Sequence, residues 1–407
     1  HRAMAVDLHE PEALLPIPGV RLGVGRAGNR RSVRDDLVLL ALDAGTTVAG
    51  LFTRNAYCAA PVTLCRKRLA ERTAVRGLLI NSGNANAGTG RSGMEAARQC
   101  ATAAETQLGG MVLPFSTGVI GEPLPVDRMC SAIPRAAGQL RSDAWLDAAR
   151  AIMTTDTVAK GCSERLQLKD GREITITGIA KGAGMICPDM ATMLAFIATD
   201  APISRRDLQK ALEEVAADSF NAITIDGDTS TNDSLILAAT GAAGGVALVE
   251  GQAAHRQFLQ ALQRVCDHLA QAVVRDGEGA TRFITIAVEG ATHRDEARAV
   301  GYTLAHSPLF KTAAFAGDPN WGRILAAVGR APVEDFDLSR VDIRIDEVAL
   351  IEQGEPHPDY REAAGAAVFA RPEFTVHVAL GRGRQAARVY TCDLSYDYVR
   401  INAEYRS

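Results

Sequence analysis

A threonine at the junction of a loop and an apolar strand is the residue of this sequence best suited to covalent chemistry. The stretch from Lys181 to Ile197 reads KGAGMICPDMATMLAFI. Its first half contains two glycines and a proline, which favour a loop, and the apolar run after Thr192 has the length of a buried strand. A threonine hydroxyl becomes an effective nucleophile when a nearby base takes its proton.

The base can be the α-amino group of the threonine itself. That amine has an ordinary pKa of about 8, which suits proton transfer near neutral pH. It is free only if the peptide bond between Ala191 and Thr192 is cut. A flexible loop would present the Ala191 carbonyl, and a rigid strand would hold the hydroxyl still. On spacing alone, a threonine that only begins a core strand is the commoner case.

A second group of residues has the composition of an oxyanion site. The segment MVLPF is a predicted strand, and Ser116, Thr117 and Gly118 follow it directly. We predict a glycine turn there that exposes backbone N–H groups, and such donors typically stabilise an oxyanion by about 3–4 kcal/mol each. Thr-Gly turns are common, so this pattern is weak by itself.

Three further loops carry polar residues. The asparagines of LLINSGNANA, residues 78–87, fit a polar site and a turn whose backbone they satisfy equally well. The segment DGDTSTNDS, residues 226–234, lacks the sixth-position glycine and twelfth-position glutamate of a calcium loop, so we expect a polar loop that lines a cleft. Glu278 lies between two glycines at a helix-to-strand turn, where it can reach a ligand amine or, as is commoner, face solvent.

Helical and strand patterns alternate along the chain, which predicts an α/β fold. Helices are expected at about residues 92–108, 144–153, 204–217 and 252–274, and Ser204 is the expected N-cap of the third. Strands are expected at about residues 37–42, 78–87, 111–115, 173–179, 193–198, 281–288, 341–345, 373–380 and 387–392. The GVGRAG motif of residues 23–28 is not a dinucleotide fingerprint, because no helix start follows it, and we expect a strand–turn–strand passage instead.

The composition excludes several classes of protein. The 407 residues are 47% hydrophobic and 23% charged, which is typical of a globular protein with enough core for two domains. A net charge of −4 without a basic run argues against nucleic-acid binding. The eight cysteines form no C-x-x-C pair and lie near no histidine at metal-ligand spacing, which predicts reduced thiols, a cytoplasmic protein and no metal. We also expect no membrane span, because no apolar run is long enough.

The run from Lys181 to Leu194 resembles the self-cleavage signature of the ornithine acetyltransferases of arginine biosynthesis, also called glutamate N-acetyltransferases. NSGNANA, the Thr-Gly pair, Thr-Thr-Asp at residues 154–156 and the DGDTSTND loop match the same family in the same order. The resemblance implies a layered α/β/β/α sandwich that cuts itself between Ala191 and Thr192. The products would be an α chain, residues 1–191, and a β chain, residues 192–407, that stay packed and assemble as a heterotetramer of two α and two β chains.

The resemblance also implies a reaction. An acetyl group would move from N2-acetyl-L-ornithine to L-glutamate in a ping-pong reaction through an acetyl-Thr192 enzyme, without a metal or cofactor. Some members also accept acetyl-coenzyme A, and that donor stays open. The family pattern assigns the oxyanion to the Thr117 hydroxyl and the Gly118 N–H, and assigns substrate binding to Thr155, Lys181, Thr192, Glu278, Asn402 and Ser407.

Two alternatives belong to other functional classes. A self-cleaving aminopeptidase of a related fold would use the same nucleophile but let water, rather than an amino acid, resolve the acyl-enzyme. A non-catalytic amino-acid-binding protein would keep an intact chain, which gives one band on a denaturing gel instead of two.

Overall fold

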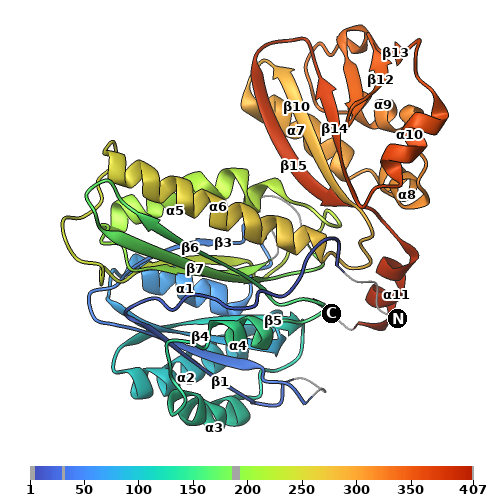
Figure 1. The fold of residues 1–407 in the computed structure, drawn as a ribbon. Helices are drawn as coiled ribbons and strands as arrows, with labels where there is room; N and C mark the ends of the chain where they lie inside the picture. Colours follow the sequence, from blue (N-terminus) through green and yellow to red (C-terminus); the bar gives the residue numbers. More distant parts are fainter. Residues whose placement is uncertain (1–4, 30–32, 186–192, 406–407) are drawn as a thin grey trace.

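The computed structural model describes residues 5–29, 33–185 and 193–405. Three residues expected at the site, Ala191, Thr192 and Ser407, lie outside this range. The described chain forms a sandwich of two sheets and a C-terminal part built on a third sheet (Figure 1). Within these ranges, no helix is both long enough and apolar enough to cross a membrane.

The first sheet has the strand order β1-β2-β4-β5. Its strands are β1 (Val20–Gly25), β2 (Leu37–Leu42), β4 (Val75–Asn84) and β5 (Met111–Val119). Strands β1, β2 and β4 are antiparallel, whereas β4 and β5 are parallel and are joined by helix α2 (Gly90–Leu108). The antiparallel β1–β2 pair confirms that the GVGRAG motif belongs to a strand–turn–strand passage.

The second sheet has the strand order β3-β9-β8-β7-β6. Its strands are β3 (Thr47–Phe52), β9 (Ser234–Ala239), β8 (Leu194–Thr199), β7 (Glu173–Lys181) and β6 (Lys160–Gln167). Every residue of β8 is buried. Ala195 and Ile197 face the helices, whereas Phe196 and Ala198 face the first sheet. Because both faces of this strand are covered, it reads in the sequence as one continuous apolar run.

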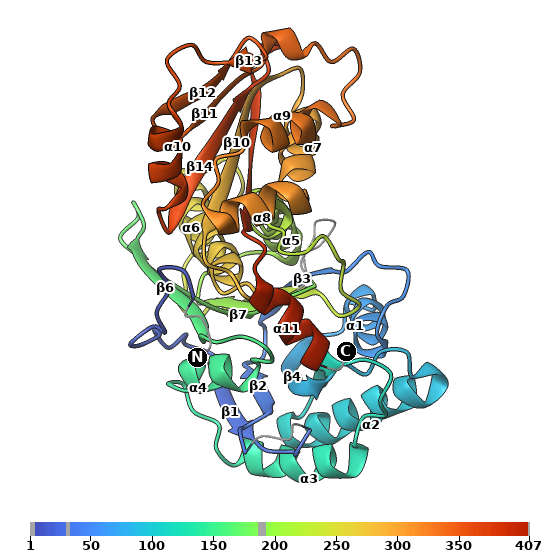
Figure 2. The ribbon, with the colours of Figure 1, turned by 90° about the vertical axis from the view of Figure 1, so that its right-hand side faces the viewer.

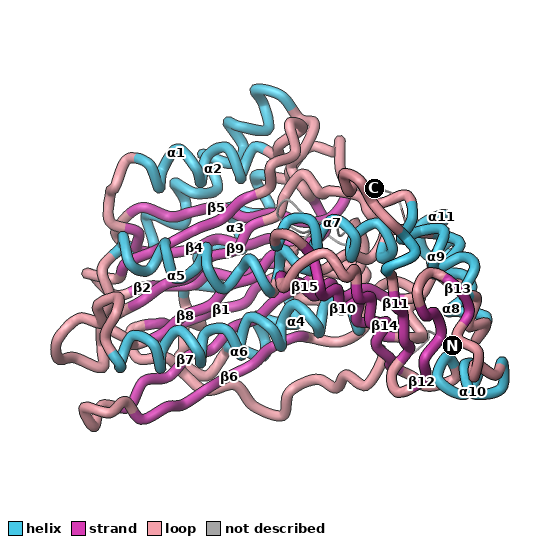
Figure 3. Tube along the Cα trace, turned by 90° about the horizontal axis from the view of Figure 1, so that it is seen from above, coloured by secondary structure: helices cyan, strands magenta, loops and turns pink. Residues whose placement is uncertain are grey.

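Helices cover the outer face of each sheet. Helices α2 and α3 (Val126–Ala137) pack on the first sheet, and α5 (Arg205–Asp218) and α6 (Ala253–Arg275) pack on the second. Figure 1 shows the layers in this order, and Figure 3 shows from above that α5 and α6 run roughly along the strands. Helix α1 (Ala60–Ala70) contacts β5 and β3, and α4 (Trp145–Ala151) contacts β1 and β7. The predicted α/β/β/α sandwich is confirmed.

The C-terminal part is a six-stranded sheet with the order β13-β12-β11-β14-β10-β15. The strands are β10 (Phe283–Ala291), β11 (Asp342–Ile345), β12 (Val348–Glu352), β13 (Glu355–Pro356), β14 (Glu373–Ala379) and β15 (Gln385–Cys392). The helices are α7 (Arg294–Ala305), α8 (Pro308–Ala316), α9 (Trp321–Gly329) and α10 (Glu362–Phe369), and this part also contains the short 3-10 turn η2 (Leu338–Arg340). Another 3-10 turn, η1 (Phe220–Ala222), follows α5, and its Phe220 lies in the core of the second sheet. A separate apolar core joins this sheet to its helices.

The last helix, α11 (Tyr396–Glu404), returns from the C-terminal part to the sandwich (Figure 2). Two hydrogen bonds hold it there. The Tyr398 hydroxyl donates to Asp226 Oδ2 over 3.0 Å, and Asn402 Nδ2 donates to Glu278 Oε2 over 2.5 Å. The end of the chain therefore contributes side chains to a region that the sandwich builds.

The predicted helices agree with α2, α4, α5 and α6 to within two residues at each end. Ser204 caps α5 as expected, because its hydroxyl accepts from the Asp207 N–H. The predicted glycine turn after Phe115 is wrong. Thr117 and Gly118 continue strand β5, where the pairing with β4 becomes irregular. Gly118 has φ 136°, and a Cβ there would lie 2.3 Å from the carbonyl carbon of Gly83, so this glycine allows a close approach of two strands.

Phe196→Ala tests the packing between the two sheets. The Phe196 ring meets Phe115 edge to face, with 5.0 Å between ring centroids. Its removal leaves a cavity, and we expect the free energy of unfolding to fall by about 3–5 kcal/mol in chemical denaturation. Val246→Ala is the control, since Val246 is 78% exposed, and should change that free energy by less than about 0.5 kcal/mol. Equal stability of the two variants would contradict this packing.

Candidate active site

A cavity opens at the edge of the sandwich where β5 and β7 end and β9 begins. The residues that line it surround about 600 Å³ of space, part of which is continuous with open solvent. Every predicted site residue within the described ranges lines it. These residues are Thr117 and Gly118 from β5, Thr155 from the loop after α4, Lys181 from the end of β7, Glu278 from the turn after α6, and Asn402 from α11.

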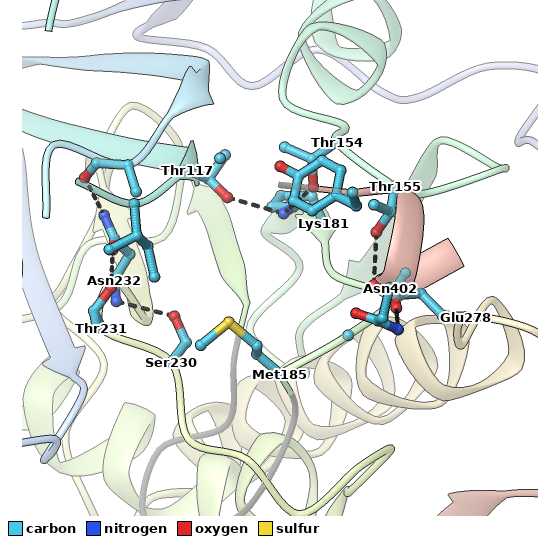
Figure 4. A pocket seen from close by; sticks show the side chains of 16 residues that line it. Thr117, Thr154, Thr155, Lys181, Met185, Ser230, Thr231, Asn232, Glu278 and Asn402 are labelled. Carbon is cyan, nitrogen blue, oxygen red and sulfur yellow. Dashed lines mark hydrogen bonds between the residues drawn. The ribbon is translucent and has the colours of Figure 1, made fainter. Parts of the chain in front are cut away.

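Lys181 supplies a buried positive charge on one side of the cavity (Figure 4). Its Nζ donates to Thr117 Oγ1 over 2.9 Å and to Thr154 Oγ1 over 2.8 Å. Because a hydroxyl that accepts from an ammonium turns its own hydrogen elsewhere, Thr117 can donate that hydrogen to a ligand. Lys181 therefore both charges the cavity and orients the hydroxyl that is expected to hold the oxyanion.

Glu278 supplies a buried carboxyl on another side of the cavity (Figure 4). Its Oε1 accepts from Thr155 Oγ1 over 3.1 Å, and its Oε2 accepts from Asn402 Nδ2 over 2.5 Å. Burial raises the pKa of this carboxyl, and the two hydrogen bonds only partly offset that rise. A ligand ammonium at this point would restore the charged form by direct attraction.

The polar loop before β9 lies at the cavity, as the sequence predicted. Ser230, Thr231 and Asn232 all line it. Asn232 Nδ2 donates to the carbonyl oxygens of Ala85, over 2.7 Å, and Ser116, over 2.8 Å. This asparagine therefore fixes the backbone beside Thr117, a role that the sequence alone did not distinguish among the residues of this loop.

The asparagines of residues 78–87 mainly satisfy the backbone. Asn81 Nδ2 donates to the Asn84 carbonyl over 2.9 Å, and Asn84 Oδ1 accepts from the Asn86 N–H over 2.8 Å. Ala85, between them, lines the cavity. The sequence left two interpretations open, a polar site or asparagines that hydrogen-bond to the backbone of a turn. The second describes these side chains, while their segment forms part of the cavity wall.

Asp233 is a buried acid that sequence reasoning missed. The residue is 1% exposed, and the Ser230 side chain and the Met193 backbone are the hydrogen-bonding groups beside its carboxyl. Burial raises the pKa of this carboxyl well above its ordinary value. The next residue, Ser234, donates its N–H to the Met193 carbonyl, which places Asp233 beside the start of β8. The sequence shows several acids in this loop, but it does not show which one is buried.

The arrangement suits a ligand that carries both signs of charge. One ammonium, one carboxyl, hydroxyls and an amide converge on one cavity. Within the described parts of the chain, no three His, Cys, Asp or Glu side chains are grouped so that they could hold a metal ion. The charges of both signs and the hydrogen-bonding groups that line the cavity favour recognition of an amino acid or its acyl derivative.

Comparison with known proteins gives consistent matches. The model of the ArgJ family matches residues 21–407. The chain is 55% identical over 397 residues to the arginine biosynthesis bifunctional protein ArgJ of Methylococcus capsulatus, with 97% of each chain covered. It is 52% identical over 412 residues to the protein of the same name from Pseudomonas fluorescens, covering 99% of this chain and 100% of that one. A crystal structure of the ArgJ protein from Bacillus halodurans matches with 39% identity and a TM-score of 0.49, covering 51% of this chain and 96% of that chain.

Glu278→Gln tests the charge of the cavity carboxyl. Burial raises the pKa of the Glu278 carboxyl. As the pH falls, this carboxyl should therefore become protonated, and lose its attraction for an ammonium, at a pH above the ordinary glutamate pKa of about 4.3. We expect an acidic limb in the pH profile of kcat/KM that the glutamine variant lacks. At neutral pH the variant should lose about 10- to 100-fold in kcat/KM. Glu71→Gln, an exposed change, is the control; an unaltered limb in Glu278→Gln would refute the assignment.

Gly184→Ala tests the close packing of the loop against Glu278. A Cβ at Gly184 would lie 2.1 Å from Glu278 Oε1, so the carboxyl must move away. Because only the end of a side chain shifts, we expect a rise in KM of about 10-fold with little change in stability. Gly138→Ala is the matched control, since its nearest neighbour would lie 3.5 Å away. Steady-state kinetics and thermal unfolding of both variants measure these effects, and an unchanged KM would count against the proposed role of Glu278.

Proposed function

The chain belongs to the ArgJ family and is an acyltransferase of arginine biosynthesis, and from this premise we propose that it transfers the acetyl group of N2-acetyl-L-ornithine to L-glutamate. The observation that carries the proposal is the convergence of Lys181, Thr117, Gly118 and Glu278 on one cavity. Both amino acids carry charged groups of each sign, and the cavity offers a partner for each sign.

Substrate binding follows from the two charged side chains. We propose that Glu278, steadied by Thr155 and Asn402, binds the ammonium group of the substrate. The Lys181 ammonium attracts a carboxylate group of the substrate. Because it donates to Thr117 Oγ1, the Thr117 hydroxyl hydrogen is left to donate to the acetyl carbonyl oxygen. Ser407 stays part of the proposed substrate site through the family pattern alone.

The proposed nucleophile is Thr192, freed by a cut after Ala191. Leu194 follows Thr192 by two residues and pairs with Lys181 across β7 and β8. Two residues of chain span at most about 7 Å. Chain connectivity therefore supports a reacting threonine close to Lys181 and its partner Thr117.

The acetyl transfer is proposed to take place in two steps, acetylation of Thr192 and then transfer of the acetyl group to glutamate. The Thr192 hydroxyl loses its proton to the Thr192 α-amine and attacks the acetyl carbonyl, while Thr117 and Gly118 hold the oxyanion. The C–N bond then breaks, and ornithine leaves with the proton. The glutamate amine next attacks the acetyl ester, its proton passes to the threonine oxygen, and N-acetylglutamate is released.

The assembled enzyme is proposed to contain two α chains, residues 1–191, and two β chains, residues 192–407, in the cytoplasm. Acetyl-coenzyme A is a second candidate donor. Attack of Thr192 on its thioester would give the same acetyl-Thr192 intermediate, with the coenzyme A thiol as the leaving group. An assay of acetyl transfer to glutamate with this donor decides whether the enzyme has one activity or two.

Thr192→Ala tests both the cut and the reaction. Without the hydroxyl we expect a single intact chain on a denaturing gel and a loss of acetyl transfer to the background rate. The unsubstituted chain should give two fragments, with one new amino terminus at Thr192 by end sequencing. Thr63→Ala, an exposed change on α1, should cut and transfer normally. Normal transfer by Thr192→Ala, or a single chain start in active enzyme, would overturn the proposal.

A further inference from the structure

A second lysine, Lys160, is buried next to the cavity without lining it. It begins strand β6, and its side chain is 0% exposed. The described cavity wall does not include it. An ammonium placed wholly inside a protein is costly unless its donors are all satisfied, so its surroundings indicate what it does there.

Three acceptors surround the Lys160 ammonium. Nζ lies 2.5 Å from Asp156 Oδ2, 2.7 Å from Asp276 Oδ2 and 3.2 Å from the Val158 carbonyl oxygen. These three bonds use all the hydrogens of the ammonium. Both aspartates are buried as well, so the three charges form a network that water does not screen.

Asp156 connects Lys160 to two walls of the cavity. Its Oδ1 accepts from the Thr154 N–H over 3.0 Å, and its Oδ2 accepts from the Gly182 N–H over 2.9 Å. One carboxylate therefore fixes the backbone next to Lys181 and the backbone of the loop that carries Thr154. Thr154 is in turn a hydrogen-bond partner of Lys181 Nζ.

Asp276 connects Lys160 to the third wall. It lies two residues before Glu278, and it accepts from the backbone N–H groups of Thr157, over 2.8 Å, and Val158, over 3.2 Å. The Glu278 N–H donates to the Ala183 carbonyl over 2.8 Å, which closes the ring of contacts.

We infer that Lys160 is a positioning residue that sets the distance between the two charged groups of the cavity, Lys181 and Glu278. It does so because its two aspartate partners hold the segments that carry these groups. The inference rests on the proposed function, in which both groups bind the same substrate. Displacements of about 1 Å in such a site can cost about 100-fold in rate.

Lys160→Met keeps the length of the side chain and removes the ammonium. Without substrate, we expect backbone amides of three segments, residues 154–157, 181–184 and 276–279, to exchange with deuterium about 10-fold faster or more. In the folded fraction of the same samples, kcat/KM for acetyl transfer should fall about 100-fold. Asp276→Asn is a second variant, in which Lys160 keeps its ion pair with Asp156. Amide exchange and kcat/KM should change in the same direction as in Lys160→Met, but by a smaller factor. This variant keeps the test usable if Lys160→Met fails to fold.

Arg382→Met is the matched control. Arg382 pairs with the buried Glu296 over 3.1 Å in the C-terminal part, so its loss also removes a partly buried ion pair but lies outside the network. We expect lower thermal stability with normal exchange in the three segments and normal kinetics. Unchanged exchange in the three segments of both network variants, or kinetic constants within twofold of the unsubstituted chain, would overturn the inference. If the unsubstituted chain itself transfers no acetyl group, the proposed function fails, and the exchange measurement alone decides the role of Lys160.

Discussion

Two opposite charges are buried in one cavity, and each has neutral hydrogen-bond partners. Lys181 donates to two threonine hydroxyls, and Glu278 accepts from a threonine hydroxyl and an asparagine amide. These partners compensate part of the desolvation of each charge while leaving it able to meet a ligand. A substrate with both signs of charge then gains attraction at two points, and this constraint explains why polar loops from distant parts of the chain meet here.

Strands β8 and β9, at the centre of the second sheet, are buried along their whole length and almost entirely apolar. The polar groups of the cavity come from the ends of strands and from the loops beside them. The register of the second sheet then sets their relative positions. Lys181 lies opposite Leu194 on the next strand, and Leu194 lies beside Ser234 on the strand after it. The cavity is therefore a property of strand ends, and α11 closes it by bringing Asn402 from the end of the chain.

Hydrophobic periodicity and capping residues predicted an α/β chain and the ends of α2, α4, α5 and α6. Local patterns carry this information, since periodicity and caps depend on near neighbours. The layered sandwich and the set of residues that share one cavity were implied by the family resemblance instead. The turn proposed at Thr117 and Gly118 was wrong because pairing with β4 continues the strand past the glycine. The burial of Lys160 and Asp233 could not be predicted, because their surroundings come from residues far along the chain. A lysine in an otherwise ordinary strand gives no local sign that two aspartates enclose it.

A cut after Ala191 would divide the residues of the site between two chains, but the contacts that position them would still join those chains. Thr117, Thr155 and Lys181 would belong to the first chain, and Glu278 and Asn402 to the second. Strands β7 and β8, one from each chain, pair along six positions, and β3 of the first chain pairs with β9 of the second. The buried contact between Lys160 and Asp276 also joins the two chains. The sheet pairing, the core and this ion pair all join the two proposed chains. After the loss of one peptide bond, these non-covalent contacts would therefore still hold the cavity in the same arrangement.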